Sequence, residues 1–219
     1  MNKNIITRNA ELQLCNMRAV DDEKRLIEGY AVVFNKRSHL LWDYNSYDVV
    51  EEEISPAAIT MDMLREQDIV ACINHQQNQI LARWRGGEGS LELEIDEVGL
   101  KVRFSAPDTP WGQQAYEGVK RGDYYGMSFA YWNDDDKLNV SYVKETDGDK
   151  EIIVRIVNKI DHICDVSIVT HPAYEETSVK ARSLDGIKSA IDEQFGNKPQ
   201  ERNAEMMSQY DELMRITRQ

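Results

Sequence analysis

Short runs of β-branched and aromatic residues recur along the first 182 residues, and many of them alternate apolar with polar positions. Such runs are typical of half-buried strands. Polar or glycine-bearing stretches separate most of them, and 35–46 and 76–79 in particular are expected as a loop and a turn. Strands are expected at 11–20, 25–34, 47–54, 69–74, 80–84, 90–95, 99–105, 124–132, 138–144, 151–159 and 163–170.

Two segments carry helix-start signals, because a hydroxyl side chain followed by proline suits the N-cap and first helical positions. Ser55-Pro56 predicts a short helix to about residue 66. Thr109-Pro110 predicts another to about Lys120, with Gly122 just beyond as a C-terminal stop.

The pattern changes after residue 182. Apolar residues recur at helical spacing from Leu184 to Phe195 and again within 204–218, and no strand-like run remains. The sequence therefore predicts a β-rich α+β domain over 1–182, with a few surface helices, followed by a helical tail over 183–219. Many strands joined by short turns favour a barrel or a sandwich over a parallel sheet.

Composition narrows the class of protein. With 41% hydrophobic and 30% charged residues the chain is typical of soluble globular proteins, and no run is long enough to span a bilayer. Met1–Ala10 lacks the apolar stretch of a secretory signal, so a cytoplasmic location is expected. The net charge of −13 disfavours binding to nucleic acid or to an anionic membrane.

Cofactor motifs are absent from the sequence. Cys15, Cys72 and Cys164 are widely spaced and form no C-x-x-C pair, and the four histidines show no metal-ligand spacing. Neither a phosphate-binding nor a dinucleotide-binding glycine motif occurs. We therefore expect neither a metal nor a cofactor.

Three residues are candidates for serine catalysis, which needs a hydroxyl beside a base. Ser128 lies within a strand among aromatic residues, His75 stands where a strand ends, and Asp165 is a charge inside an apolar run. Each also has a simple structural interpretation: a small packing residue, a solvated strand end, and a carboxylate that needs a partner when buried. Pattern and periodicity do not bring the three together.

Four groups of segments, in order along the chain, resemble the prohead proteases of tailed phages. They span about residues 28 to 182. The sequence differs from the family pattern at Ala57-Ala58 and at Ala82, where relatives carry glycine, and in both places one small residue replaces another. The segments are Glu28–Phe34 with Glu53–Ile59; Asn74-His75 with Ile80–Arg83; Asp96–Leu100, Asp108–Gly112 and Gly122–Phe129; and Asp165–Tyr174.

The resemblance implies a serine endopeptidase with Ser128 as nucleophile and His75 as its base. Asp165 occupies the place of an acidic third member. The related herpesvirus assemblins use a second histidine instead, which would point to His162 or His171. The relation to the assemblins also implies that this chain folds as an antiparallel β-barrel and suggests that it forms a homodimer. The oxyanion-hole residues are not identified by the sequence.

The implied substrates are the scaffold protein and the scaffold domain of the major capsid protein, together with the protease itself. The site of action would be the phage procapsid within the host cytoplasm. The tail 183–219 would be a tether to scaffold or shell, a segment removed by self-cleavage, or a helix packed on the parent domain. Two other functions remain open: a catalytically silent assembly protein that keeps the fold, and a small-molecule serine hydrolase with an enclosed pocket.

Overall fold

The computed structural model describes residues 6–10, 15–38, 41–43, 48–134, 136–147 and 150–170, all within one compact unit, Met1–Glu175. The structure is 57% strand with few helices, which confirms a β-rich α+β fold. The expected tail 183–219 lies outside the described residues and stays a prediction. Among the described residues no helix is long and apolar enough to cross a membrane.

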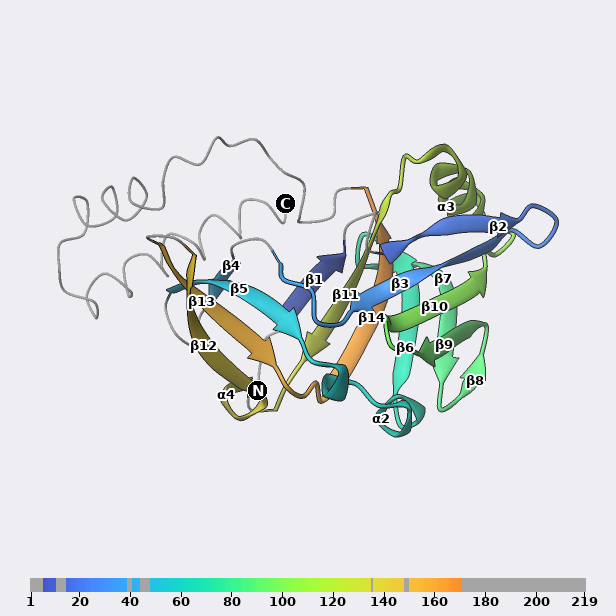
Figure 1. Ribbon diagram of the computed structural model, residues 1–219. Helices are drawn as coiled ribbons and strands as arrows, with labels where there is room; N and C mark the ends of the chain where they lie inside the picture. The colour runs from blue at the N-terminus through green and yellow to red at the C-terminus, as the bar shows by residue number, and fades with distance from the viewer. Residues whose placement is uncertain are drawn as a thin grey trace. The chain divides into compact units, whose positions relative to one another are not determined.

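The largest sheet has six strands and runs through the middle of the described fold (Figure 1). Its pairs are antiparallel except that β14 and β6, which are adjacent, run parallel. In spatial order the strands are β1 (Ile6–Ala10), β11 (Gly126–Trp132), β14 (His162–Val169), β6 (Asp68–Ile73), β7 (Gln76–Arg85) and β8 (Glu88–Gly89).

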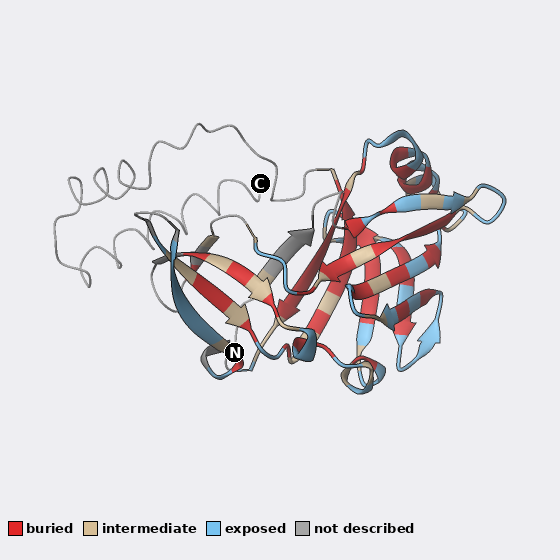
Figure 2. Cartoon of the chain, viewed as in Figure 1, coloured by how far each residue is buried: buried red, intermediate tan, exposed pale blue. Residues whose placement is uncertain are grey.

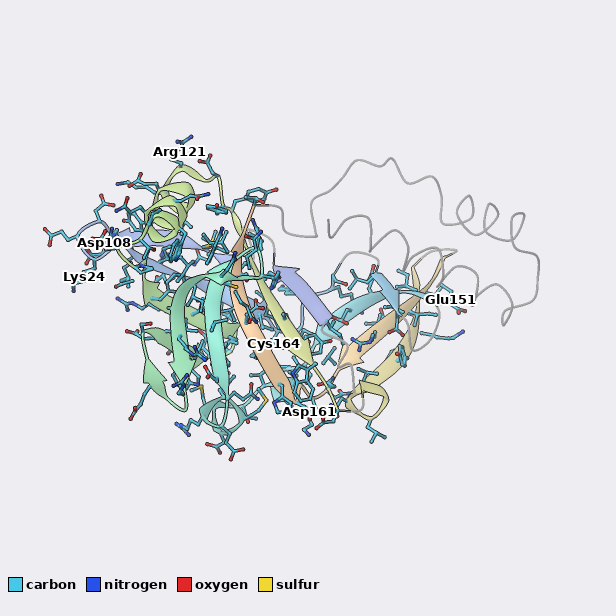
Figure 3. All side chains as sticks on the ribbon, turned by 180° about the vertical axis from the view of Figure 1, so that it is seen from behind. Lys24, Asp108, Arg121, Glu151, Asp161 and Cys164 are labelled. Carbon is cyan, nitrogen blue, oxygen red and sulfur yellow. The ribbon has the colours of Figure 1, made fainter. Side chains whose placement is uncertain are left out.

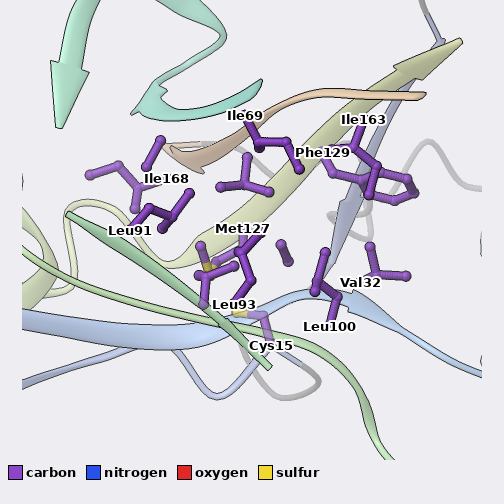
Figure 4. Packing of buried hydrophobic residues seen from close by; sticks show 14 of the residues in the cluster. Cys15, Val32, Ile69, Leu91, Leu93, Leu100, Met127, Phe129, Ile163 and Ile168 are labelled. Atoms are coloured by element: carbon purple, nitrogen blue, oxygen red, sulfur yellow. The ribbon is translucent and has the colours of Figure 1, made fainter. Parts of the chain in front are cut away.

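A second sheet packs against one face of the first. Its order is β2 (Arg18–Asp21), β3 (Leu26–Val33), β10 (Gly99–Ser105) and β9 (Leu91–Ile95), all antiparallel. Side chains of both sheets form one hydrophobic core, in which Met127 and Ile168 of the first sheet lie with Leu93 and Leu100 of the second (Figure 4). The strands around this core carry most of the buried residues (Figure 2).

Close contacts fix this second sheet. A Cβ on Gly99 would lie 1.9 Å from the carbonyl oxygen of Val32, so only glycine allows β10 to approach β3 this closely. The Tyr30 hydroxyl donates a hydrogen bond of 2.7 Å to the Asp96 carboxylate. That bond, with smaller effects of burial and nearby acidic residues, raises the pKa of Tyr30 to about 12.

A third sheet has the order β12 (Val140–Asp147), β13 (Lys150–Val157), β5 (Asp48–Ile54) and β4 (Leu41–Asp43). Arg155, only 1% exposed, is its most buried charge. Its guanidinium contacts the Glu52 carboxylate, lies 3.4 Å from Asp43 Oδ1, and reaches the hydroxyl of Tyr131 in β11 at 3.5 Å. This buried ion cluster connects the third sheet to the first.

The expected antiparallel barrel is not what the described residues form. No closed barrel is found among them, and β13 pairs with β5 in parallel, as β14 does with β6. Both parallel pairs join segments that lie far apart in the sequence. Turn spacing reports only on neighbours in the chain, so it could not reveal this pairing.

Most expected elements are confirmed, with local exceptions. The helix expected from Ser55-Pro56 is split into a 3₁₀ turn, η1 (Pro56–Ala58), and α2 (Met61–Arg65), because buried Ile59 between them is extended. The helix α3 (Pro110–Arg121) is as predicted, capped by Thr109 and ended by Gly122 at φ +81°. The short elements β1, β4, β8 and α4 (Asp136–Asn139) were not predicted, and among the described residues of the strand expected at 11–20 only those from Arg18 onward are in a strand, β2.

Candidate active site

His75 lies on the two-residue turn that joins β6 to β7, where Ile73 pairs with Gln76. The turn expected at 76–79 is therefore wrong, since β7 already begins at Gln76. Asn74 and His75 have φ of +47° and +59°, the left-handed pair that a type I′ hairpin requires. The second position usually holds glycine, so His75 carries a backbone strain of about 1–3 kcal/mol.

Ser128 lies at the centre of β11. Its register partner on β14 is Ser167, whose partner on β6 is Cys72, so the three side chains share one face of the sheet. The flanking Met127 and Phe129 point to the opposite face, into the hydrophobic core (Figure 4). Ser128 is fully buried, and this packing fixes its position on a rigid strand.

The structure brings the three candidate residues into contact. His75 Nε2 lies 2.5 Å from Ser128 Oγ, and His75 Nδ1 lies 2.6 Å from Asp165 Oδ1. The Asp165 side chain is 5% exposed, whereas the His75 side chain is 23% exposed. A carboxylate can only accept, so the Nδ1–H tautomer donates to Asp165 and leaves the Nε2 lone pair facing Ser128.

A β-bulge in β14 decides where Asp165 points. The pairing with β11 shifts between Ala130 and Tyr131, opposite Cys164 (labelled in Figure 3). As a result Ile163 and Val166, three residues apart, both belong to the core. Without the bulge, strict alternation would put Asp165 on the same face as Ile163, inside that core. The bulge thus turns Asp165 to the side of His75.

Of the two other histidines proposed for the third position, His162 is not near this cluster. His162 stacks on Trp132, with ring centroids 3.7 Å apart, and the two residues are register partners. Trp132 lies four positions along β11 from Ser128, a distance of about 13 Å. His171 lies outside the described residues.

Ser167 is a polar neighbour to which sequence reasoning gave no role. Its Oγ lies 2.9 Å from Asp165 Oδ1, 3.1 Å from the backbone nitrogen of His75 and 3.1 Å from Cys72 Sγ. Burial, and then the nearby charge of Asp165, raise the pKa of the Cys72 thiol to about 12. A serine two residues after Asp165, in an otherwise apolar strand, was the signal in the sequence.

Comparison with known proteins assigns the chain to a family. The family model described as caudovirus prohead serine protease matches residues 13–190, which is most of the chain and includes every residue of the cluster. No curated protein and no solved structure matches. Members of this family are serine peptidases that act in phage maturation on capsid-related proteins within the procapsid. The chain belongs to the caudovirus prohead serine protease family and is a serine peptidase.

Proposed function

We propose that Ser128, His75 and Asp165 are the catalytic triad of this peptidase. The observation that carries the proposal is the continuous pair of short contacts, 2.5 Å from Ser128 Oγ to Nε2 and 2.6 Å from Nδ1 to Asp165 Oδ1. A free serine is a weak nucleophile and needs an adjacent base, which in turn needs a group that orients it. These three residues supply that set of roles in the correct order of contact.

The proposed mechanism follows from the proton positions. His75 Nε2 takes the proton of Ser128 Oγ as that oxygen attacks the carbonyl carbon of the scissile peptide bond. Asp165 stabilises the imidazolium so formed, and His75 then gives the proton to the leaving amine. Water, deprotonated by the same base, hydrolyses the acyl-enzyme and regenerates Ser128. Each donor to the tetrahedral oxyanion would contribute about 3 kcal/mol.

We propose further that the substrates are the scaffold protein and the scaffold domain of the major capsid protein, with self-cleavage of the protease. The support is the family, whose substrates are capsid-related proteins. The place of action would be the procapsid in the host cytoplasm, with 183–219 as a tether or a self-cleaved segment. A homodimer, by likeness to the assemblins, is the oligomeric state to test by analytical ultracentrifugation.

The test is cleavage of a purified capsid precursor by the wild type and by Ser128→Ala, with Ser141→Ala as the matched control. Ser141 is an exposed serine of β12 that accepts a hydrogen bond from Asn158 and lies outside the triad. We expect Ser128→Ala to abolish cleavage, keep the thermal unfolding temperature, and leave the precursor intact on a gel. Proteolysis retained by Ser128→Ala would refute the assignment.

The same assay separates the two other functions. A silent assembly protein predicts that the wild type leaves the precursor intact while binding it. A small-molecule hydrolase predicts that a simple ester is hydrolysed in a Ser128-dependent way while the precursor is not cut.

A further inference from the structure

We propose that Ser167 is a positioning residue, whose hydroxyl holds both the backbone of His75 and the carboxylate of Asp165. This inference rests on the proposed triad and adds a fourth side chain to it. Ser167 is 1% exposed and lies on the strand face that carries Ser128, as the register partner of that serine.

The single hydroxyl proton decides the direction of each bond. Asp165 Oδ1 can only accept, so the Ser167 hydroxyl donates to it across 2.9 Å. The two lone pairs of Oγ are then left to accept from the His75 backbone N–H at 3.1 Å and from Cys72 Sγ at 3.1 Å. The Cys72 thiol is then the donor in that last contact, and burial, which raises its pKa to about 12, keeps the thiol protonated. Oγ also lies 3.4 Å from His75 Nδ1, whose proton points to the closer Asp165 Oδ1.

The bond to the backbone acts on a strained turn. His75 has φ +59°, a conformation that a residue with a side chain keeps only when its surroundings hold it. The neighbouring Asn74 N–H donates to the Ile168 carbonyl of β14 at 3.0 Å, and the His75 N–H donates to Ser167 one residue earlier on the same strand. Two adjacent residues of β14 therefore hold the two strained residues of the turn.

The bond to the carboxylate acts on the other end of the imidazole. Asp165 Oδ1 receives both the Ser167 hydroxyl and the ring Nδ1–H, at 2.9 Å and 2.6 Å. A carboxylate with a fixed second donor keeps its rotamer, and the ring then keeps the direction in which Nε2 faces Ser128. Ser167 Oγ thus fixes His75 in two ways, through the backbone N–H of His75 and through the Asp165 carboxylate that orients its ring.

The alternative is that Ser167 is only a small residue that fits a crowded sheet. The two interpretations differ in what alanine does. If packing alone matters, Ser167→Ala leaves catalysis unchanged, because serine and alanine differ by one oxygen atom. If the hydroxyl positions the site, its loss removes a hydrogen bond to a charged group and leaves the His75 N–H without its acceptor.

The experiment measures kcat and KM for precursor-peptide cleavage by Ser167→Ala, together with the downfield NMR resonance of the His75 Nδ1–H proton. The control is Ser38→Ala, which also removes a hydroxyl that accepts a backbone N–H, here from Glu52 at 2.8 Å in the third sheet. We expect kcat to fall about ten- to hundred-fold with KM unchanged, and the resonance to move or broaden. The control should keep the wild-type kcat and resonance.

Ser167→Cys covers the case in which the alanine variant does not fold. The cysteine side chain is similar in size to serine, but its thiol forms only weak hydrogen bonds, so kcat should fall as it does in Ser167→Ala. Wild-type kcat in either variant, or an unchanged His75 resonance, would overturn the inference. The proposal of the triad would be refuted by a different result, cleavage of the precursor by Ser128→Ala, so the two proposals can be refuted independently.

Discussion

Replacing Asp165 with asparagine tests the most buried charge of the site. The change keeps the shape of the side chain but removes a charge whose oxygen lies 2.6 Å from His75 Nδ1. In the transition state the imidazole carries a positive charge. With charge centres roughly 4 Å apart and an effective dielectric constant of about 20, the lost attraction is about 4 kcal/mol. That corresponds to about a 10³-fold lower kcat.

Tautomer choice adds to this loss. If the amide NH₂ of the introduced asparagine side chain faces Nδ1, the ring proton moves to Nε2, and His75 can no longer accept the proton of Ser128. In the well-known serine protease triad the same change lowers kcat about 10⁴-fold. We therefore expect a fall of about 10³- to 10⁴-fold in kcat, with KM little changed.

The assay is steady-state cleavage of a fluorogenic peptide taken from a mapped cleavage site. Asp161→Asn is the matched control, because Asp161 is a partly buried carboxylate just before β14 that forms an ion pair with Lys159 and lies outside the triad (labelled in Figure 3). It should keep its kcat. A loss of less than about tenfold in Asp165→Asn, in a protein that unfolds at the wild-type temperature, would refute the role given to this carboxylate.

Other predictions concern the scaffold of the site, each measured by denaturant unfolding. Arg155→Met leaves the two buried carboxylates of its cluster without their cation, so it should lower the free energy of unfolding by about 3–5 kcal/mol at pH 7. The control Arg65→Met, at an exposed ion pair, should lower it by under about 1 kcal/mol, and equal losses in the two variants would contradict the burial argument. Gly99→Ala forces a Cβ onto the Val32 carbonyl and should lower the free energy of unfolding by about 1–3 kcal/mol or more. The control Gly87→Ala should lower it by about 1 kcal/mol, because φ is +94° there but nothing lies within 4 Å. Unchanged stability in Gly99→Ala would mean that β10 can move away from β3. The pKa of Tyr30 is raised from 10.0 to about 12, so the unfolded chain releases this proton first and stability falls as pH rises from about 10 to 12. The pKa values of Tyr116 and Tyr142 are also raised to about 12, so Tyr30→Phe should remove part of that slope, and an unchanged slope would exclude a contribution from Tyr30.

The sequence predicted most of the strands because a half-buried strand shows its period directly. The segment that became β10 and the helix α3 with its caps follow from local rules that need no knowledge of the rest of the chain. Local rules failed where a tertiary contact overrode them. The turn at Asn74-His75 was misplaced because a histidine at a left-handed position has no local signal when a bond to β14 holds it there.

The site divides in the same way. The sequence by itself determined the residue types, Ser128 in a packed strand, His75 at a strand end and Asp165 in an apolar run, and its ordered motifs indicated the family. Only the tertiary structure decided that they meet. The contact depends on the parallel pairing of β14 with β6, on the register that aligns Ser128 with Ser167, and on the bulge at Cys164 that turns Asp165 out of the core. Each of these is a pairing between strands distant in the sequence, and the free energy that selects it comes from packing of the whole sheet, which no local window of residues contains.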